Sequence, residues 1–550
     1  MRQQIRPYLL LALATFVLFS LPPALFLLKF RADAPFYFLA QDSFYYLSIA
    51  LHSRGVPFFT INGLYPTNGF HPLWEWMEYL AARAAFFRLD QPSIVPRLWA
   101  ADIGIVGTAT ALFAAYVYRY TRRAWVAIVA VCPGWFWLLL GVGSPAHLNN
   151  WTFVNGMETG VELLFFACAA LLFGREFRWG PRFVLGCFAL GCTVLSRLDD
   201  VFFLAAIAAF AVLAGPRQER LKRLAAFAIP VLMIAGYLVY NHRTVGVWLP
   251  VSGAAKAGSG YRAGIGETLR LLTGWPFWTM EPFSVAFQYA LTWGLVAQML
   301  GPVIIAVGFL LWARRREGVS PAVKALAVGV LLKGGYNFVV VPLGYQGAWY
   351  YGVSIATANL ILAMFVAELE RRWRTGSAFE AGDGGVWVAP LRSILVGLAL
   401  LALAFFSFNV TASRASQYGF QRTRLAYDER GEIRAAIEKT GHPLFLEFQD
   451  GELSFATGLP SISGFGLAGD PLAARAQRQG TYFDLLARRG VTIAAASGTY
   501  PWAIEAARVN KRLFTVWGFK QEEIAHYRFE PFWSDATGDV VLYRIVHDVR

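Results

Sequence analysis

PYLLLALATFVLFSLPPALFLLK, residues 7–29, is an apolar segment with no charge before its final lysine. At a rise of about 1.5 Å per residue, it is long enough to cross the hydrocarbon core of a membrane as a helix. Arg2 and Arg6 precede it and no convincing small-residue cleavage site follows it, so we expect a retained span with a cytoplasmic N-terminus. Because 57% of the 550 residues are hydrophobic and 15% are charged, the composition predicts a polytopic α-helical membrane protein.

Further apolar segments bring the expected number of membrane helices to about eleven. They cover residues 98–118, 124–142, 157–173, 183–197, 199–214, 224–240, 284–312, 322–343, 351–369 and 391–408. Arginine and lysine clusters follow alternate spans, on the side that this count assigns to the cytoplasm. The net charge of +14 then reflects orientation and contact with anionic lipid headgroups, and we expect no nucleic-acid partner.

The membrane region is expected to cover residues 1–408. Its first external loop, residues 30–97, is longer than a hairpin between two spans requires and is rich in aromatic residues. Within this loop, residues 44–54 and 73–87 predict helices that lie in the membrane interface, with tryptophan and tyrosine at the level of the headgroups.

Residues 409–550 are more polar and alternate between helix and strand patterns, which predicts a small α/β domain. The expected elements are helices at residues 427–439 and 473–489 and strands at residues 444–448, 491–496 and 540–546. An odd number of spans places this domain outside the plasma (inner) membrane, on the exoplasmic or periplasmic side. We interpret the glycine-rich loops at residues 448–452 and 464–470 as turns, with acceptor-glycan binding as the alternative.

The polar residues of most interest fall at the outer end of the membrane region in this topology. The first loop carries QDSFYY at residues 41–46 and YPTNGFHPLW at residues 65–74. Ionisable groups at the bilayer edge are costly, and their convergence on one face favours a functional site. The candidates are Asp42, Tyr45, Asn68, His71, Glu158, Arg197, Asp199, Asp200 and Lys256.

These residue types suit glycosyl transfer from a sugar phosphate. A carboxylate that faces a water-filled cavity can take a proton from an acceptor hydroxyl group, which makes Asp42 the candidate general base. Lys256 and Arg197 could hold the phosphate leaving group, arginine through its planar fork and lysine as a point charge. Simpler alternatives stay open: helix caps for Asp42, His71 and Glu158, a structural ion pair for Arg197 with Asp199, and a solvated loop position for Lys256.

Several segments together resemble a known family. They are Asp42 with residues 44–46, PTNGFHPLW at residues 66–74, NGMET at residues 155–159 and WLPVSGAAK at residues 248–256. They resemble multi-spanning glycosyltransferases of the GT-C superfamily, in particular a group similar to polyprenyl-phosphate-dependent arabinofuranosyltransferases and, more distantly, protein mannosyltransferases.

The resemblance implies a GT-C-like fold and an inverting hexosyl- or pentosyltransferase. The donor would be a polyprenyl-phosphate sugar, and the acceptor a cell-envelope glycan, lipid or protein on the outer face of the membrane. Asp42 would be the general base. We assign donor and phosphate binding to Tyr45, His71, Arg197 and Lys256, and the acceptor pocket to Asn68, Glu158, Asp199 and Asp200.

The chain departs from the family pattern at two places. The family often has two acidic residues where this chain has Gln41 and Asp42, so we assign no metal to this motif, and a divalent cation has no support from the sequence. RLDD at residues 197–200 stands where arginine, proline, aspartate and glycine are expected. The 4 cysteines lie in predicted spans without a metal-ligand spacing, and we expect no cofactor.

Two other function classes compete with a transferase. A transporter or flippase of a lipid-linked or small polar substrate would explain Lys333, which lies within a predicted span, but no internal repeat supports this reading. A non-catalytic protein of envelope assembly would explain the polar C-terminal region. It would not explain why Asp42, Glu158, Arg197 and Lys256 converge.

Overall fold

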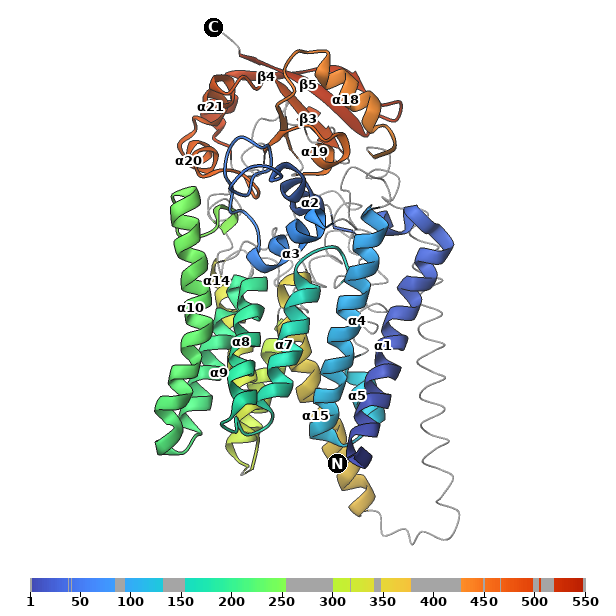
Figure 1. The fold of residues 1–550 in the computed structure, drawn as a ribbon, viewed down its shortest axis with the longest axis vertical. Helices are drawn as coiled ribbons and strands as arrows, with labels where there is room; N and C mark the ends of the chain where they lie inside the picture. Colours follow the sequence, from blue (N-terminus) through green and yellow to red (C-terminus); the bar gives the residue numbers. More distant parts are fainter. Residues whose placement is uncertain are drawn as a thin grey trace, which may run out of the picture.

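The computed structural model consists of a helical bundle with a smaller domain containing a sheet at one end (Figure 1). The structure describes residues 2–37, 39–40, 42–84, 94–131, 154–253, 300–316, 318–340, 348–376, 427–448, 451–464, 466–497, 504–505 and 519–547. The predicted domain boundary near residue 409 and the predicted span at residues 391–408 lie outside these ranges.

The bundle consists of apolar helices at most of the positions where spans are predicted. Within the described ranges, 5 helices are long and apolar enough to cross a membrane, and Thr159–Phe173, Pro181–Ser196 and Leu300–Arg314 are shorter apolar helices. The total of about eleven spans stays a prediction. The main helices are α1 (Arg2–Phe30), α4 (Ile94–Thr121), α5 (Ala124–Val131), α7 (Thr159–Phe173), α8 (Pro181–Ser196), α9 (Val201–Leu213), α10 (Arg220–Val245), α14 (Pro321–Val340) and α15 (Gly352–Gly376).

Helix α7 lies at the centre of the bundle, packed against α4 and α8, while α9 packs against α14. Aromatic side chains such as Phe166, Phe173 and Phe203 form part of a continuous apolar core between these helices. Helix α8 begins at Pro181. A proline at the first position of a helix costs no hydrogen bond, because the N–H that it lacks would have no partner within the helix. The 3-10 turn η4 (Leu198–Asp200) then joins α8 to α9, as the predicted break between residues 197 and 199 requires.

The two helices predicted in the first external loop exist, but their surroundings differ from the prediction. Helix α2 (Ser43–His52) and helix α3 (Pro72–Arg83) lie between the bundle and the C-terminal domain (Figure 1). The expectation of aromatic residues at headgroup level is wrong for α2, because Phe44, Tyr45 and Tyr46 are only 1%, 6% and 0% exposed. Protein on both sides buries this helix.

The C-terminal domain is α/β, as predicted, with the strand order β2-β1-β3-β5-β4. Strands β1 (Phe445–Glu447), β2 (Ser461–Ser463) and β3 (Ile493–Ser497) are parallel, while β5 (Val540–His547) pairs antiparallel with β3 and with β4 (Tyr527–Ser534).

The sequence patterns missed β2 and β4. The helix predicted at residues 473–489 is two helices. The helices are α18 (Arg430–Glu438), α19 (Glu452–Thr457), α20 (Pro471–Gln479), α21 (Tyr482–Arg488) and α24 (Gln521–Ile524).

The C-terminal domain packs closely on the first external loop through its glycine-rich turns. Thr67 donates a hydrogen bond to the carbonyl of Gly469 at 2.7 Å, and Ser48 donates to the hydroxyl of Ser454 at 2.8 Å. The Arg489 guanidinium lies 3.7 Å from the centre of the Tyr65 ring. These contacts hold the domain over α2 and α3, and both interpretations of the glycine-rich loops, as turns or as an acceptor-glycan site, stay predictions.

A methyl group at Gly69 should disturb this contact. A Cβ atom there would lie 1.8 Å from the carbonyl oxygen of Leu467, so the backbone of one partner would have to move. We expect Gly69→Ala to destabilise the protein by on the order of 1–3 kcal/mol, measured as a lower melting temperature. Gly431→Ala is the control, since nothing lies within 4 Å of its added atom. Equal melting temperatures for the two variants would contradict the tight contact.

The stability of the C-terminal domain should depend on the protonation of Glu523. Burial raises the pKa of this carboxyl group to about 7, against a hydrogen bond from the Phe483 N–H that favours the charged form. The pKa of Glu523 in the folded protein lies above the unfolded value of about 4.3. The stabilisation that the protonated carboxyl group contributes is therefore complete below about pH 4.3 and is lost as the pH rises through about 7. Raising pH from about 5 to 8 should lower the melting temperature of the wild type more than that of Glu523→Gln. If the melting temperatures of the two proteins fell equally with pH, the assigned role of Glu523 would be wrong.

Candidate functional site

Asp42 immediately precedes α2 in a helical backbone conformation, with φ −60° and ψ −20°, and its side chain makes no cap hydrogen bond to the helix. The helix-cap alternative for Asp42 is therefore wrong. The side chain is half-buried. Gln41, beside it, lies outside the described residues.

Two stacked tyrosines follow Asp42 on α2, and one of them binds a second carboxylate, Glu158. The rings of Tyr45 and Tyr46 are 4.3 Å apart, and the Tyr46 hydroxyl donates to Oε2 of Glu158 at 3.1 Å. The pKa of Tyr45 lies well above its usual value, first because the group is buried, and then because Glu158 and Asp42 both place negative charge near it. Asp42 and Glu158 therefore share one electrostatic environment around Tyr45.

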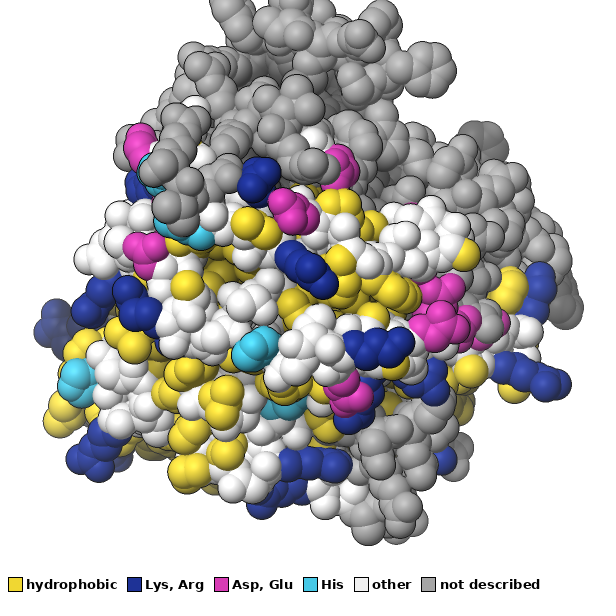
Figure 2. Space-filling view, turned by 90° about the horizontal axis from the view of Figure 1, so that it is seen from above, with side chains coloured by type: hydrophobic (Ala, Val, Ile, Leu, Met, Phe, Trp, Pro, Cys, Tyr) yellow, Lys and Arg dark blue, Asp and Glu magenta, His cyan; other side chains and the backbone are white. Residues whose placement is uncertain are grey.

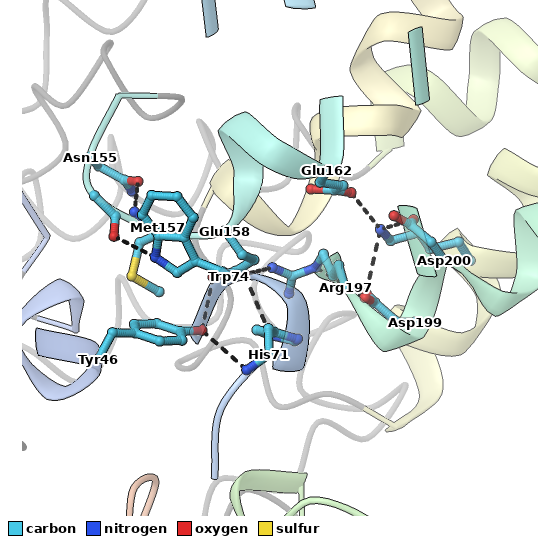
Figure 3. Close-up of polar contacts among 12 residues, drawn as sticks. Tyr46, His71, Trp74, Asn155, Met157, Glu158, Glu162, Arg197, Asp199 and Asp200 are labelled. Carbon is cyan, nitrogen blue, oxygen red and sulfur yellow. Dashed lines mark hydrogen bonds and ion pairs between the residues drawn. The ribbon is translucent and has the colours of Figure 1, made fainter. Parts of the chain in front are cut away.

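Glu158 is the centre of the site, at the N-terminal end of α7 (Figure 3). Its Oε1 lies 2.5 Å from Nη1 of Arg197 and 3.5 Å from Nε2 of His71. The side chain is 1% exposed and makes no cap hydrogen bond to α7. The cap alternative is thus wrong for Glu158, and it is wrong for His71 too, whose side chain does not cap α3.

A chain of ion pairs leads from Glu158 to helix α14. Nε of Arg197 lies 3.0 Å from Oδ1 of Asp199, and its guanidinium stacks 4.0 Å from the Tyr350 ring centre. Nζ of Lys333 lies 2.6 Å from Oδ1 of Asp200 and 3.5 Å from Oδ2 of Asp199. We call Glu158, Glu162, Arg197, Asp199, Asp200 and Lys333 the ionic network.

The ion-pair alternative for Arg197 is confirmed by these contacts. The guanidinium is 2% exposed and is held by two carboxylates and an aromatic ring, so it is not presented to a phosphate in this structure. The Arg197 guanidinium holds the Glu158 carboxylate in place through this ion pair. Asp200, which is 0% exposed, likewise faces Lys333 instead of an open acceptor pocket.

One member of the ionic network was missed in the sequence and another was assigned to a different function. Glu162, the missed residue, is fully buried on α7, 3.5 Å from Nζ of Lys333, and its spacing of four residues from Glu158 is the signal that could have found it. Lys333 was noted only as support for a transporter. Its three carboxylate partners, Glu162, Asp199 and Asp200, account for its position within an apolar helix.

The described residues directly before α7, from residue 154 on, are held tightly, which fixes Glu158. Gly156 adopts φ +76°, a conformation that favours glycine. Its N–H donates to Oδ2 of Asp102 at 3.0 Å, and its carbonyl accepts from the Trp74 indole at 3.1 Å. Asn155 contributes by accepting the Met157 N–H at 3.1 Å. Trp74 therefore has a structural role in joining α3 to this loop.

Asn68 does not offer its amide to an acceptor. Its Oδ1 accepts the Val251 N–H at 3.0 Å, and its Nδ2 donates to the carbonyl of Leu249 at 3.3 Å. Asn68 therefore ties the segment after α10 to the first external loop. That segment continues toward Lys256, which lies outside the described residues.

Metal binding has no support in the described part of the chain. There, no group of three or more histidine, cysteine, aspartate or glutamate side chains is arranged to hold a metal ion.

Comparison with known proteins finds distant structural likeness only. No protein-family description matches the sequence, and no curated protein shows significant sequence similarity to it. The archaeal oligosaccharyltransferase AglB from Archaeoglobus fulgidus, in complex with an inhibitory peptide and a dolichol-phosphate, is 13% identical with a TM-score of 0.41, over 91% of this chain and 70% of that one. The A. fulgidus oligosaccharyltransferase tethered to an acceptor peptide is 12% identical with a TM-score of 0.43, over 92% and 70%. This likeness is too distant to assign a substrate.

Proposed function

We propose that this chain is a membrane-embedded inverting glycosyltransferase that moves a sugar from a polyprenyl-phosphate donor to a glycan, lipid or protein of the cell envelope. The observation that carries the proposal is the ordered polar site around Glu158, next to the half-buried Asp42 and beneath the C-terminal domain. Buried charges of this number are costly to maintain in an apolar bundle, which favours a chemical use for them.

Asp42 has the role of general base in this proposal. It is half-buried, whereas Glu158 is fully buried and already binds Arg197, His71 and Tyr46. Asp42 is thus the better placed of the two carboxylates to meet an acceptor hydroxyl group. Glu158 acts beside it as a fixed negative charge that orients His71 and Tyr46.

The reaction is a single displacement. The acceptor oxygen bonds to the anomeric carbon, its proton passes to Asp42, and the bond from that carbon to the phosphate oxygen breaks, which releases the polyprenyl phosphate. The carbon inverts because the acceptor attacks opposite the leaving group. We assign the phosphate contact to Lys256, because an ammonium group can hold a phosphate as a point charge.

The stereochemistry of the product tests this mechanism. Purified protein receives a polyprenyl-phosphate sugar of known anomeric configuration, carbon-13 labelled at the anomeric position, and NMR records the configuration of the product. We expect the opposite configuration in the product, with one polyprenyl phosphate released per sugar transferred. Retention of configuration would contradict the single displacement.

A further inference from the structure

The C-terminal domain carries a groove that is separate from the site around Glu158. It has a volume of about 820 Å³ and runs between α18 and the hairpin of β4 and β5. Clefts of about 300–1,000 Å³ are the size that binds small organic ligands in proteins. None of its lining residues belongs to the ionic network.

Two aromatic side chains of β4 share the groove because the strand is irregular. The register of β4 against β5 shifts between Pro531 and Trp533, so that Pro531 pairs with Tyr543 and Trp533 with Leu542. Phe532 is the extra residue of this bulge. In a regular strand Phe532 and Trp533 would point to opposite faces, but here both pack against the same apolar cluster and both line the groove. A bulge that redirects a side chain in this way is typical of functional positions.

The groove also has basic side chains at its edge. Lys439, directly after α18, and Arg544 of β5 line it, and Glu432 is the one acidic residue among the described lining residues. The Arg544 guanidinium lies 5.5 Å from the centre of the Phe532 ring, and within the described residues neither Lys439 nor Arg544 forms an ion pair with a carboxylate. Figure 2, which looks onto this domain, shows basic, acidic and hydrophobic side chains interspersed over its described surface.

We propose that this groove binds an oligosaccharide that carries carboxylate groups. Flat aromatic side chains such as Phe532 and Trp533 provide apolar area for the face of a sugar ring. Arg544 and Lys439 then supply the charge, because a guanidinium can bind a carboxylate through two parallel hydrogen bonds. Such binding needs neither a donor nor Asp42, and so it does not depend on the transferase proposal.

Calorimetry on the purified full chain in lipid nanodiscs tests this binding. The probes are tetragalacturonate, which is acidic, and maltotetraose, which is neutral and of equal length. We expect tetragalacturonate to bind at least about tenfold more tightly than maltotetraose. Arg544→Gln should weaken tetragalacturonate binding about tenfold, since it removes an exposed charge that no carboxylate compensates.

Arg475→Gln is the matched control, because this exposed arginine lies on α20 and outside the groove. Unchanged affinity in this control, with loss in Arg544→Gln, supports the proposal. Trp533→Ala should also weaken binding, and a melting temperature close to that of the wild type would show that the loss is local. No binding by the wild type, equal affinity for the two probes, or an equal loss in both arginine variants would overturn the proposal.

Discussion

Asp42→Asn should lower the rate of sugar transfer by about 10²–10⁴-fold and leave the affinity for the donor unchanged. Asparagine has nearly the shape of aspartate but cannot accept the proton of the acceptor hydroxyl group. The carboxylate is half-buried and makes no cap hydrogen bond to α2, so loss of a helix cap cannot explain the effect. Initial rates at saturating donor, with separate measurement of donor affinity, give the two quantities.

Asp33→Asn is the control for this prediction. Asp33 lies in the 3-10 helix η1 (Arg31–Tyr37), in the same external loop, and the substitution removes the same charge. We expect it to keep close to wild-type activity. If Asp42→Asn retained the rate of the wild type, Asp42 would not be the base.

Arg197→Met should destabilise the whole bundle. The guanidinium compensates Glu158 and Asp199, with ion-pair distances of 2.5 and 3.0 Å. Removal of one partner from a buried ion pair costs about 3–5 kcal/mol, because the remaining charge is left without compensation in an apolar interior. We expect a large fall in the melting temperature in detergent and poor recovery of folded protein.

Arg178→Met separates this effect from simple loss of an arginine. Arg178 pairs with Glu176 at 3.1 Å, but its side chain is 87% exposed, and such pairs contribute about 0–1 kcal/mol. The double variant Arg197→Met with Glu158→Gln should recover part of the lost stability, since one uncompensated charge is also removed. Equal melting temperatures for Arg197→Met and Arg178→Met would contradict the account of the ionic network.

Apolar length predicted most of the described bundle helices, because each helix must satisfy its own backbone in lipid, whereas the orientation indicated by the basic clusters stays a prediction. The break between α8 and α9 was predicted to within a few residues, since RLDD interrupts an otherwise apolar run. The surroundings of α2 were not predictable in this way. Its aromatic residues suit both a membrane interface and a protein interface, and only the position of the C-terminal domain distinguishes the two.

The sequence predicted which residues come together at the candidate site better than it predicted what each of them does there. Glu158, Arg197 and Asp199 do meet, but as partners of one another. The sequence could not indicate this, since pairing depends on how α7, η4 and α14 pack. Lys333 is the clearest example: within an apolar span it suggested transport, and its carboxylate partners lie on two other elements distant in the chain.

The most direct test of the central claim is transfer of a labelled sugar by purified protein. A panel of polyprenyl-phosphate sugars is offered with envelope glycans, lipids and peptides as acceptors, to wild type and Asp42→Asn in parallel. Our account predicts a labelled product and free polyprenyl phosphate with the wild type for at least one donor. It also predicts that Asp42→Asn forms product at least about 10²-fold more slowly, although that variant still binds the donor. Equal product from both proteins, or uptake of the labelled lipid across a vesicle membrane without any transfer, would contradict it.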